Sequence, residues 1–196
     1  MNIKIILASS SPRRRQLMAQ LGLPCEIIAS DVDENAQGSA KEQVAELARR
    51  KAQAVRAKID SNETYVIIAA DTLVEVDGKI LAKPADHTEA FAMLKSLSGR
   101  RHTVYTGVVL LKVGEKERIT SFVEQAQVLF RPLSDDEILA YIATGEPFDK
   151  AGAYGVQDKG AALVARVEGD YYTVVGLPLS RLAVELAGLG IDIWQF

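Results

Sequence analysis

The sequence contains a single cysteine, Cys25, so no intramolecular disulfide can form, and we expect a protein of a reducing compartment such as the cytoplasm. Its two histidines, His87 and His102, stand far apart and without other metal-type ligands, which argues against a zinc site. We expect neither a membrane span nor a signal peptide, because no apolar run has the required length or flanks. The net charge of −3 gives no general attraction to nucleic acid or to an anionic membrane. Any phosphate site must therefore be a local concentration of cations.

The composition of the 196-residue chain, with 48% hydrophobic and 25% charged residues, is typical of a globular protein with ample material for a core. Helical and strand-like patterns alternate along the chain, and several strands are expected to pair as hairpins. This favours a mixed α/β sheet flanked by helices over a purely parallel sheet. With no repeat or evident linker, we predict a single domain over residues 1–196, in which two lobes could surround a cleft.

The segment Ser9–Arg15, SSSPRRR, lies between a predicted buried strand at residues 3–7 and a predicted helix that ends at Gly22. Ser11 is placed to cap this helix and Pro12 to be its first residue. The free N–H groups of the helix start, the serine hydroxyls and the arginines would then converge at the end of a strand. That arrangement suits a phosphate chain. A capped helix with three solvated arginines explains the same residues equally well at this point.

The most strand-like run is Tyr65–Ala70, which is apolar throughout, as in a central strand. Asp71 and Thr72 follow it, and the tip of a buried strand is where open α/β sheets place their chemistry. A carboxylate that caps a turn is the alternative. The residues 77–78, Asp-Gly, predict a hairpin whose second strand leads to Lys83.

Capping residues and apolar periodicity predict further helices. One begins after Ser39, carries Lys51, and is expected to turn most of its cations to water. Another begins after Ser134. That helix is expected to bury three residues, namely Ile138, Leu139 and Ile142.

Strands are predicted at residues 118–123 and 126–130, and a hairpin is predicted from residues 161–167 and 171–175. Before this hairpin lies the unusual stretch Asp149–Gln157, DKAGAYGVQ. Its glycines let the backbone approach a ligand or another chain closely, although a tight loop between elements is the alternative.

Three kinds of group recur at the predicted loop and strand ends: cations, acids, and small polar or amide side chains. Cations neutralise phosphate oxygens and the charge of a leaving group. Acids can hold a divalent cation shared with substrate phosphates, or orient an attacking water. Amides and hydroxyls suit the hydrogen-bonding edge of a base. These are the parts of a metal-assisted phosphoanhydride hydrolase, and the sequence has no GxxxxGK[ST] motif of a P-loop enzyme.

Eight motifs occur in order along the chain: LASSSPRRRQLM (7–18), VDE (32–34), ARRKA (48–52), AADT (69–72), GKILAKP (78–84), LSGRRH (97–102), DKAGAYGVQ (149–157) and VVGLPL (174–179). With them, nearly the whole chain resembles the Maf family of nucleoside triphosphate pyrophosphatases. The resemblance implies hydrolysis of a nucleoside triphosphate to the monophosphate and pyrophosphate with a divalent cation, Mg²⁺ or Mn²⁺. It also implies the mixed α/β fold of inosine triphosphate pyrophosphatases, a cleft between two lobes, and often a homodimer.

The resemblance also implies roles for individual residues. It makes Asp71 the catalytic acid, written as the proton acceptor, and Glu34 with Asp71 would hold the metal or the attacking water. The positions associated with base choice are Arg13, Thr72 and Gln157. The remaining polar residues of the pocket, which would bind the triphosphate, are Ser9, Arg14, Lys51 and Lys83.

The branch of the family that acts on 7-methyl-GTP typically has tryptophan after the SSSP proline and lacks GAYGVQ. This chain has Arg13 and the full GAYGVQ, so it is similar to the branch that prefers dTTP and UTP. Ala82, where many members have glycine, is a departure. Two alternatives stay open: an enzyme that removes modified pyrimidine triphosphates, and a nucleotide-sensing regulatory protein that inhibits septum formation in cell division. A nucleic-acid partner is not expected.

Overall fold

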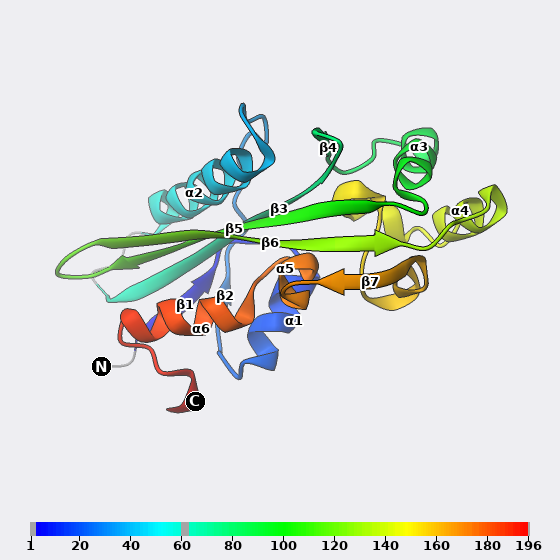
Figure 1. The fold of residues 1–196 in the computed structure, drawn as a ribbon. Coiled ribbons are helices and arrows are strands. Elements are labelled where there is room, and N and C mark those ends of the chain that lie inside the picture. Colours follow the sequence, from blue (N-terminus) through cyan, green and yellow to red (C-terminus); the bar gives the residue numbers. More distant parts are fainter. Residues whose placement is uncertain (1–2, 60–62, 196) are drawn as a thin grey trace. The chain divides into compact units, whose positions relative to one another are not determined.

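The structure is a computed structural model that describes residues 3–59 and 63–195 (Figure 1). Its elements follow in the order β1 (Lys4–Leu7), α1 (Pro12–Gln20), β2 (Glu26–Ile27), α2 (Ala40–Lys58), β3 (Tyr65–Val76), β4 (Lys79–Leu81), α3 (His87–Leu97), β5 (Arg101–Val113), β6 (Arg118–Phe130), α4 (Asp135–Ile142), η1 (Glu146–Asp149), η2 (Ala151–Ala153), η3 (Asp158–Leu163), β7 (Val164–Glu168), α5 (Tyr171–Val175), α6 (Leu179–Gly188) and η4 (Ile193–Gln195).

Seven strands are hydrogen bonded in the order β2-β1-β3-β5-β6-β7, and β4 pairs with β3. Strand β1 runs parallel to β2 and to β3, with Lys4 opposite Tyr65. The β3–β4 and β6–β7 pairs are antiparallel. The predicted mixed α/β sheet with flanking helices is therefore confirmed.

The chain divides into two compact units. Unit 1 comprises Met1–Asp71, Thr106–Val123 and Gly176–Phe196, and unit 2 comprises Thr72–Tyr105 and Glu124–Val175. Three of these boundaries fall inside strands β3, β5 and β6. A strand that continues keeps its pattern on both sides of such a boundary, so the sequence carries no linker signal there. The single domain over residues 1–196 stays a prediction.

The core of unit 1 forms where helix α2 packs on strands β1, β3 and β5 (Figure 1). Its α2 members Ala48, Ala52 and Val55 recur at helical spacing, while the β3 members alternate, as expected for a helix on a sheet. At Gly107 of β5, a Cβ atom would lie 2.5 Å from the carbonyl oxygen of Val44. The glycine therefore permits the close approach of α2 to this strand.

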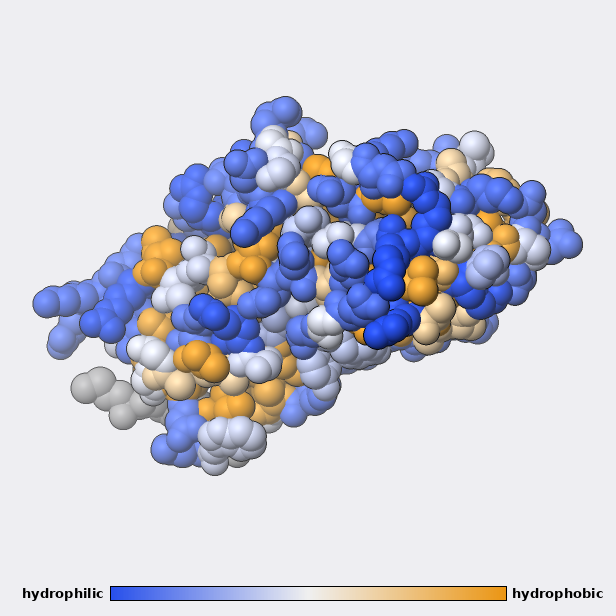
Figure 2. All heavy atoms as spheres, viewed as in Figure 1, coloured by the Kyte–Doolittle hydropathy of each residue, from blue (hydrophilic) through white to orange (hydrophobic). Residues whose placement is uncertain are grey.

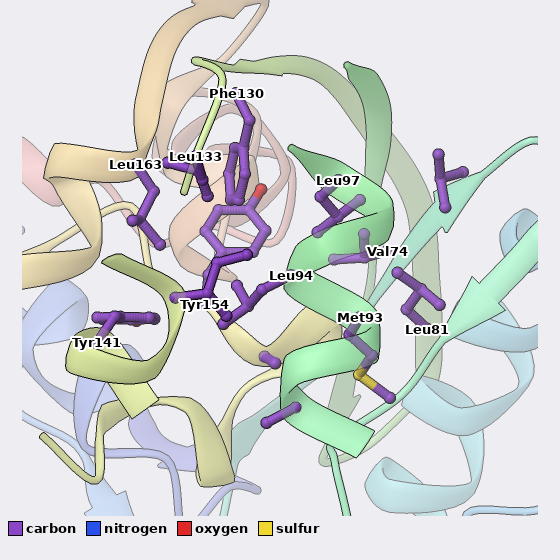
Figure 3. Close-up of a cluster of buried hydrophobic side chains, with 14 of the residues drawn as sticks. Val74, Leu81, Met93, Leu94, Leu97, Phe130, Leu133, Tyr141, Tyr154 and Leu163 are labelled. Carbon is purple, nitrogen blue, oxygen red and sulfur yellow. The ribbon is translucent and has the colours of Figure 1, made fainter. Parts of the chain in front are cut away.

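The core of unit 2 gathers side chains from β3, α3, β6 and α4 around Tyr154, which lies after η2 (Figure 3). Figure 3 shows Tyr154 next to Phe130, with Leu94 and Leu97 of helix α3 facing them. Tyr154 thus fixes the segment between η2 and η3 to the core of unit 2.

Two strand predictions need correction. Strand β3 does not end at Ala70 but continues to Val76, so Asp71 lies inside the strand instead of at its tip. The reason is that residues 72–76 keep the strand alternation and their last three residues pair with β4. The two strands expected at 118–123 and 126–130 are one strand, β6, because the residues between them stay extended.

The predicted hairpin at 161–175 is wrong in its second half, since residues 171–175 form helix α5. The Asp170 carboxylate accepts hydrogen bonds from the backbone N–H (2.7 Å) and hydroxyl (2.8 Å) of Thr173, a helix-capping contact that overrides the strand preference of the β-branched residues. The predicted burial of Leu139 is also wrong, as this residue is 54% exposed. Tyr141 is buried in its place because positions 138, 141 and 142 share one face of α4.

The outer surface carries few large exposed apolar side chains, and those described come from five different elements, β6, α4, α5, α6 and η4. Figure 2 shows hydrophilic side chains over much of the visible face, with hydrophobic ones in small groups. Scattered exposure of this kind is ordinary for a globular protein. Among the residues that the structure describes, no helix combines the length and apolar character needed to cross a membrane.

Candidate active site

Three of the predicted site residues meet in unit 1. The Nζ atom of Lys51 donates to Oδ1 of Asp71 at 2.6 Å and to Oε1 of Glu34 at 2.9 Å. The side chains of Lys51 and Asp71 are 9% and 10% exposed, whereas that of Glu34 is 52% exposed. One ammonium group therefore joins a buried carboxylate to a carboxylate that faces solvent.

The positions of Lys51 and Asp71 follow from the periodicity of their elements. On β3, Asp71 continues the row Tyr65, Ile67 and Ala69, whose side chains pack in the unit 1 core. On α2, Lys51 lies within the buried stripe that faces the same core. A buried charge is costly unless it is paired, so the pairing of Lys51 with two carboxylates is what makes this position tolerable for lysine.

The start of helix α1 forms as predicted. Ser11 is the N-cap, with its hydroxyl accepting from the N–H of Arg14 at 3.5 Å, and Pro12 is the first helical residue. The Ser9 hydroxyl accepts from the N–H of Ser11 at 3.2 Å and from Nη1 of Arg14 at 3.4 Å. Ser9 and Arg14 are thus joined in a polar network at the end of β1.

Arg14 is not one of three solvated arginines. Its Nε donates to the carbonyl oxygen of Gly176 at 2.8 Å. The two residues are far apart in the sequence, so the motif spacing could not predict this contact. Burial lowers the pKa of the Arg14 guanidinium, and the nearby charge of Asp71 acts in the opposite direction. Arginine nevertheless remains charged in proteins. The neighbouring Arg13 is half-buried, and its charge also acts on Arg14, while Arg15 is exposed.

The other predicted site residues belong to unit 2. The carbonyl of Ala82, which precedes Lys83, accepts from the N–H of Gly152 at 3.1 Å and so joins the Lys83 segment to the glycine-rich stretch. A Cβ atom on Gly152 would lie 3.0 Å from the side chain of Val74, so η2 packs on the face of β3 that carries Val74. By strand alternation, Thr72 lies on that face as well.

The stretch that carries Gln157 is anchored by a buried aromatic cluster. The hydroxyl of Tyr154 lies 2.7 Å from Nε2 of His102, and both rings pack edge-to-face with Phe130. Burial lowers the pKa of His102 to about 4 and raises the pKa of Tyr154. The sequence singled out His102 only as an unsuitable metal ligand. Its place in the buried alternation of β5, beside Val104, is the signal that predicts an inward ring.

The structure divides the predicted site residues between the two units. Unit 1 holds Ser9, Arg13, Arg14, Glu34, Lys51 and Asp71. Unit 2 holds Thr72, Lys83 and Gln157, of which Lys83 is exposed and the other two are half-buried.

The donor set of unit 1 fits a hard divalent cation only in part. Glu34 and Asp71 offer carboxylate oxygens on either side of one ammonium position. No group of three or more His, Cys, Asp or Glu side chains suited to a metal occurs in residues 3–59 and 63–195. Mg²⁺ is commonly bound by one or two carboxylates, waters and substrate phosphates, so a carboxylate pair of this kind suits a cation that arrives with a triphosphate.

The sequence was compared with those of known proteins, and two relatives match it over nearly its whole length. It is 50% identical over 195 residues to a dTTP/UTP pyrophosphatase of Caldicellulosiruptor bescii, covering 98% of each chain. It is 52% identical over 189 residues to a dTTP/UTP pyrophosphatase of Carboxydothermus hydrogenoformans, covering 96% of this chain and 100% of the relative.

Similar solved structures are the HAM1 protein of Coxiella burnetii (TM-score 0.47, 17% identity, 95% and 100% of the two chains covered) and the Ham1 protein of Staphylococcus aureus (TM-score 0.47, 14% identity, 95% and 99% covered). The sequence profile of the family described as Maf-like protein matches residues 4–189. The chain therefore belongs to the Maf-like protein family.

Proposed function

We propose that this protein hydrolyses dTTP and UTP to the nucleoside monophosphate and pyrophosphate. Water attacks the α-phosphorus, the bond from that phosphorus to the oxygen bridging the β-phosphate breaks, and a proton is released. The two relatives named above carry this activity in their names and match over nearly their full length. The observation in this chain that supports it best is the buried Asp71 carboxylate beside Lys51, with Glu34 at the solvent side.

Asp71 is our candidate for the residue that orients and deprotonates the attacking water. A carboxylate acceptor held by a single ammonium group keeps lone pairs available for that water. Lys51, with Arg14 and the Ser9 hydroxyl, would stabilise the charge that develops on the triphosphate. The N–H groups at the start of α1 add anion-binding capacity next to Ser9.

Glu34 and Asp71 would hold a divalent cation together with the substrate phosphates. Such a cation would neutralise charge on the phosphates and polarise the reacting phosphorus. Mg²⁺ and Mn²⁺ are the expected ions, because all of these donors are oxygens. The side chain of Lys51 must then yield part of its contact with the two carboxylates.

Base choice is assigned to Arg13, Thr72 and Gln157, and Lys83 is assigned to phosphate binding. The amide of Gln157 and the hydroxyl of Thr72 can both donate to and accept from a pyrimidine edge. We also expect a cytoplasmic enzyme that acts on free nucleotides, without a nucleic-acid partner, and a homodimer as in the family resemblance.

The first test is a substrate panel with purified protein and Mg²⁺ or Mn²⁺, with products identified. Monophosphate and pyrophosphate from dTTP and UTP are expected. Preference for 7-methyl-GTP or for modified pyrimidine triphosphates would overturn the specificity, and diphosphate with orthophosphate would overturn attack at the α-phosphorus. Nucleotide binding without turnover would favour the regulatory alternative.

The second test is Asp71→Asn, which should lower kcat at least about 100-fold because it removes the proton acceptor. Asp77→Asn is the matched control. Asp77 occupies the β3–β4 turn with φ 49°, a conformation that asparagine tolerates, so turnover should stay unchanged. Intact turnover in Asp71→Asn would exclude this role.

A further inference from the structure

Residues 29–38 of unit 1, which we name the Glu34 segment, lie along one side of helix α2. Three α2 side chains donate to backbone carbonyls of this segment: Gln43 to Gly38 (2.8 Å), Arg50 to Asn35 (2.7 Å) and Lys58 to Ala29 (2.9 Å). Their spacing of about two helical turns places the three donors on one side of the helix. The segment is therefore held by a row of polar tethers.

The contact made by Arg50 lies next to Glu34, the candidate metal-binding residue of this segment. The guanidinium Nη1 donates to the carbonyl of Asn35 and, at 3.4 Å, to the carbonyl of Asp33, so it holds the backbone on both sides of Glu34. The Asp33 carboxylate accepts from the N–H of Asn35 at 3.0 Å and closes the turn. The next α2 residue, Lys51, holds the Glu34 side chain itself.

We propose that Arg50 is a positioning residue that holds Glu34 against the Lys51–Asp71 pair, an inference that rests on the proposed function for the role of Glu34. The Glu34 side chain is 52% exposed, so burial does not fix its direction. The guanidinium is itself oriented, because Nε donates to Oε1 of Glu46 at 2.9 Å while Nη1 faces the carbonyls. A lysine has a single donor atom and cannot make both sets of contacts as a rigid fork.

Arg49 supplies a matched control. It pairs with the other oxygen of Glu46 at 2.7 Å, and within the described residues its hydrogen bonds go to Glu46 alone. Arg49→Ala and Arg50→Ala therefore remove the same charge and the same kind of ion pair. Only the second variant removes a hydrogen bond to the backbone of the Glu34 segment.

The kinetic experiment compares these variants on dTTP. Arg50→Ala should lower kcat/KM about tenfold and Arg50→Lys by less, while Arg49→Ala stays within about twofold, with thermal unfolding similar for the two alanine variants. In a Glu34→Gln background, Arg50→Ala should cause no further loss, because it acts through Glu34. Equal losses at positions 49 and 50, or a full additional loss in that background, would overturn the proposal.

A second readout does not depend on turnover. A glutamate-specific protease should cleave after Glu34 several-fold faster in Arg50→Ala than in Arg49→Ala, with the cleavage site identified by mass spectrometry. If the wild-type protein hydrolyses no nucleotide, the proposed function fails while this comparison still tests the tether. Equal cleavage rates after Glu34 in the two variants would overturn the positioning role itself.

Discussion

Two of the segments that carry predicted site residues outside α-helices and strands are held in opposite ways. The Glu34 segment of unit 1 is tied by polar contacts from α2, and most of its residues are exposed or half-exposed. Residues 149–158 of unit 2, which we name the Gln157 segment, are anchored by side chains inside a core. Tyr154 is 5% exposed and Val156 is 8% exposed.

The backbone of the Gln157 segment also differs from that of an ordinary exposed turn. Two non-glycine residues, Ala153 and Asp158, have φ of 61° and 52°, on either side of Gln157 and its anchor. Such conformations cost about 1–3 kcal/mol each and persist only when surrounding contacts impose them. Exposed polar tethers contribute about 1 kcal/mol or less each. We infer that holding the Gln157 segment in place lowers the folding stability of unit 2 through backbone strain. The Glu34 segment of unit 1 is held in place with little change in folding stability.

The largest expected effect is a loss of stability on removing the buried anchor. Tyr154→Ala should lower the free energy of unfolding by about 3–5 kcal/mol, because it leaves a cavity beside Phe130 and Leu94. Lys58→Ala, which removes a tether of the Glu34 segment, should cost less than about 1 kcal/mol. Urea unfolding of both variants measures the contrast. Similar losses in the two would show that both segments are held in the same way.

The next effect is a pH dependence that belongs to His102. Its pKa in the folded protein is about 4, below the ordinary value of 6.5, so the unfolded chain takes up the proton more readily. The stability linked to His102 is therefore complete above about pH 6.5 and falls by about 3 kcal/mol as the pH approaches 4. His102 faces the uncharged rings of Tyr154 and Phe130, and no opposite charge compensates for its protonation among those contacts.

Urea unfolding between pH 7 and pH 4 tests this linkage. The Asp and Glu carboxylates also titrate in this range, so the measurement is the difference between the wild type and His102→Asn. The stability of His102→Asn should fall less steeply with decreasing pH. A His102→Asn curve parallel to that of the wild type would contradict the assignment.

Local signals predicted much of the fold. The capping boxes at Ser39 and Ser134 and the turn at residues 77–78 form as expected, because a few neighbouring residues determine each of them. Helix α5 was predicted as a strand because its Tyr, Thr and Val residues favour strands, and one capping carboxylate at Asp170 decided otherwise. Three of the boundaries between the units could not be predicted, since they fall inside continuous strands.

The sequence predicted which residues belong to the candidate site, but it did not predict which of their side chains contact one another. The periods of α2 and β3 place Lys51 and Asp71 on faces that pack together, yet their pairing depends on how the helix lies on the strand. Most cations of α2 were expected to face water, and only the path of the Glu34 segment shows that Arg50 binds the backbone of that segment. The Gly176 carbonyl that receives Arg14 lies 162 residues away in sequence and has no local signal.

The smallest expected change in the free energy of unfolding comes from removing one buried tyrosine hydroxyl. The comparison is between Tyr154, whose hydroxyl is hydrogen bonded, and Tyr65. Tyr154→Phe keeps the ring but leaves Nε2 of His102 without its partner, and we expect a loss of about 1–2 kcal/mol. Tyr65→Phe removes the same atom from the core of unit 1, where the hydroxyl is buried and has no hydrogen-bond partner among the described residues, so stability should be unchanged or slightly higher. Urea unfolding of both variants at pH 7 measures the difference. Equal losses would mean that ring packing alone anchors the Gln157 segment, and the histidine would then have no part in holding it.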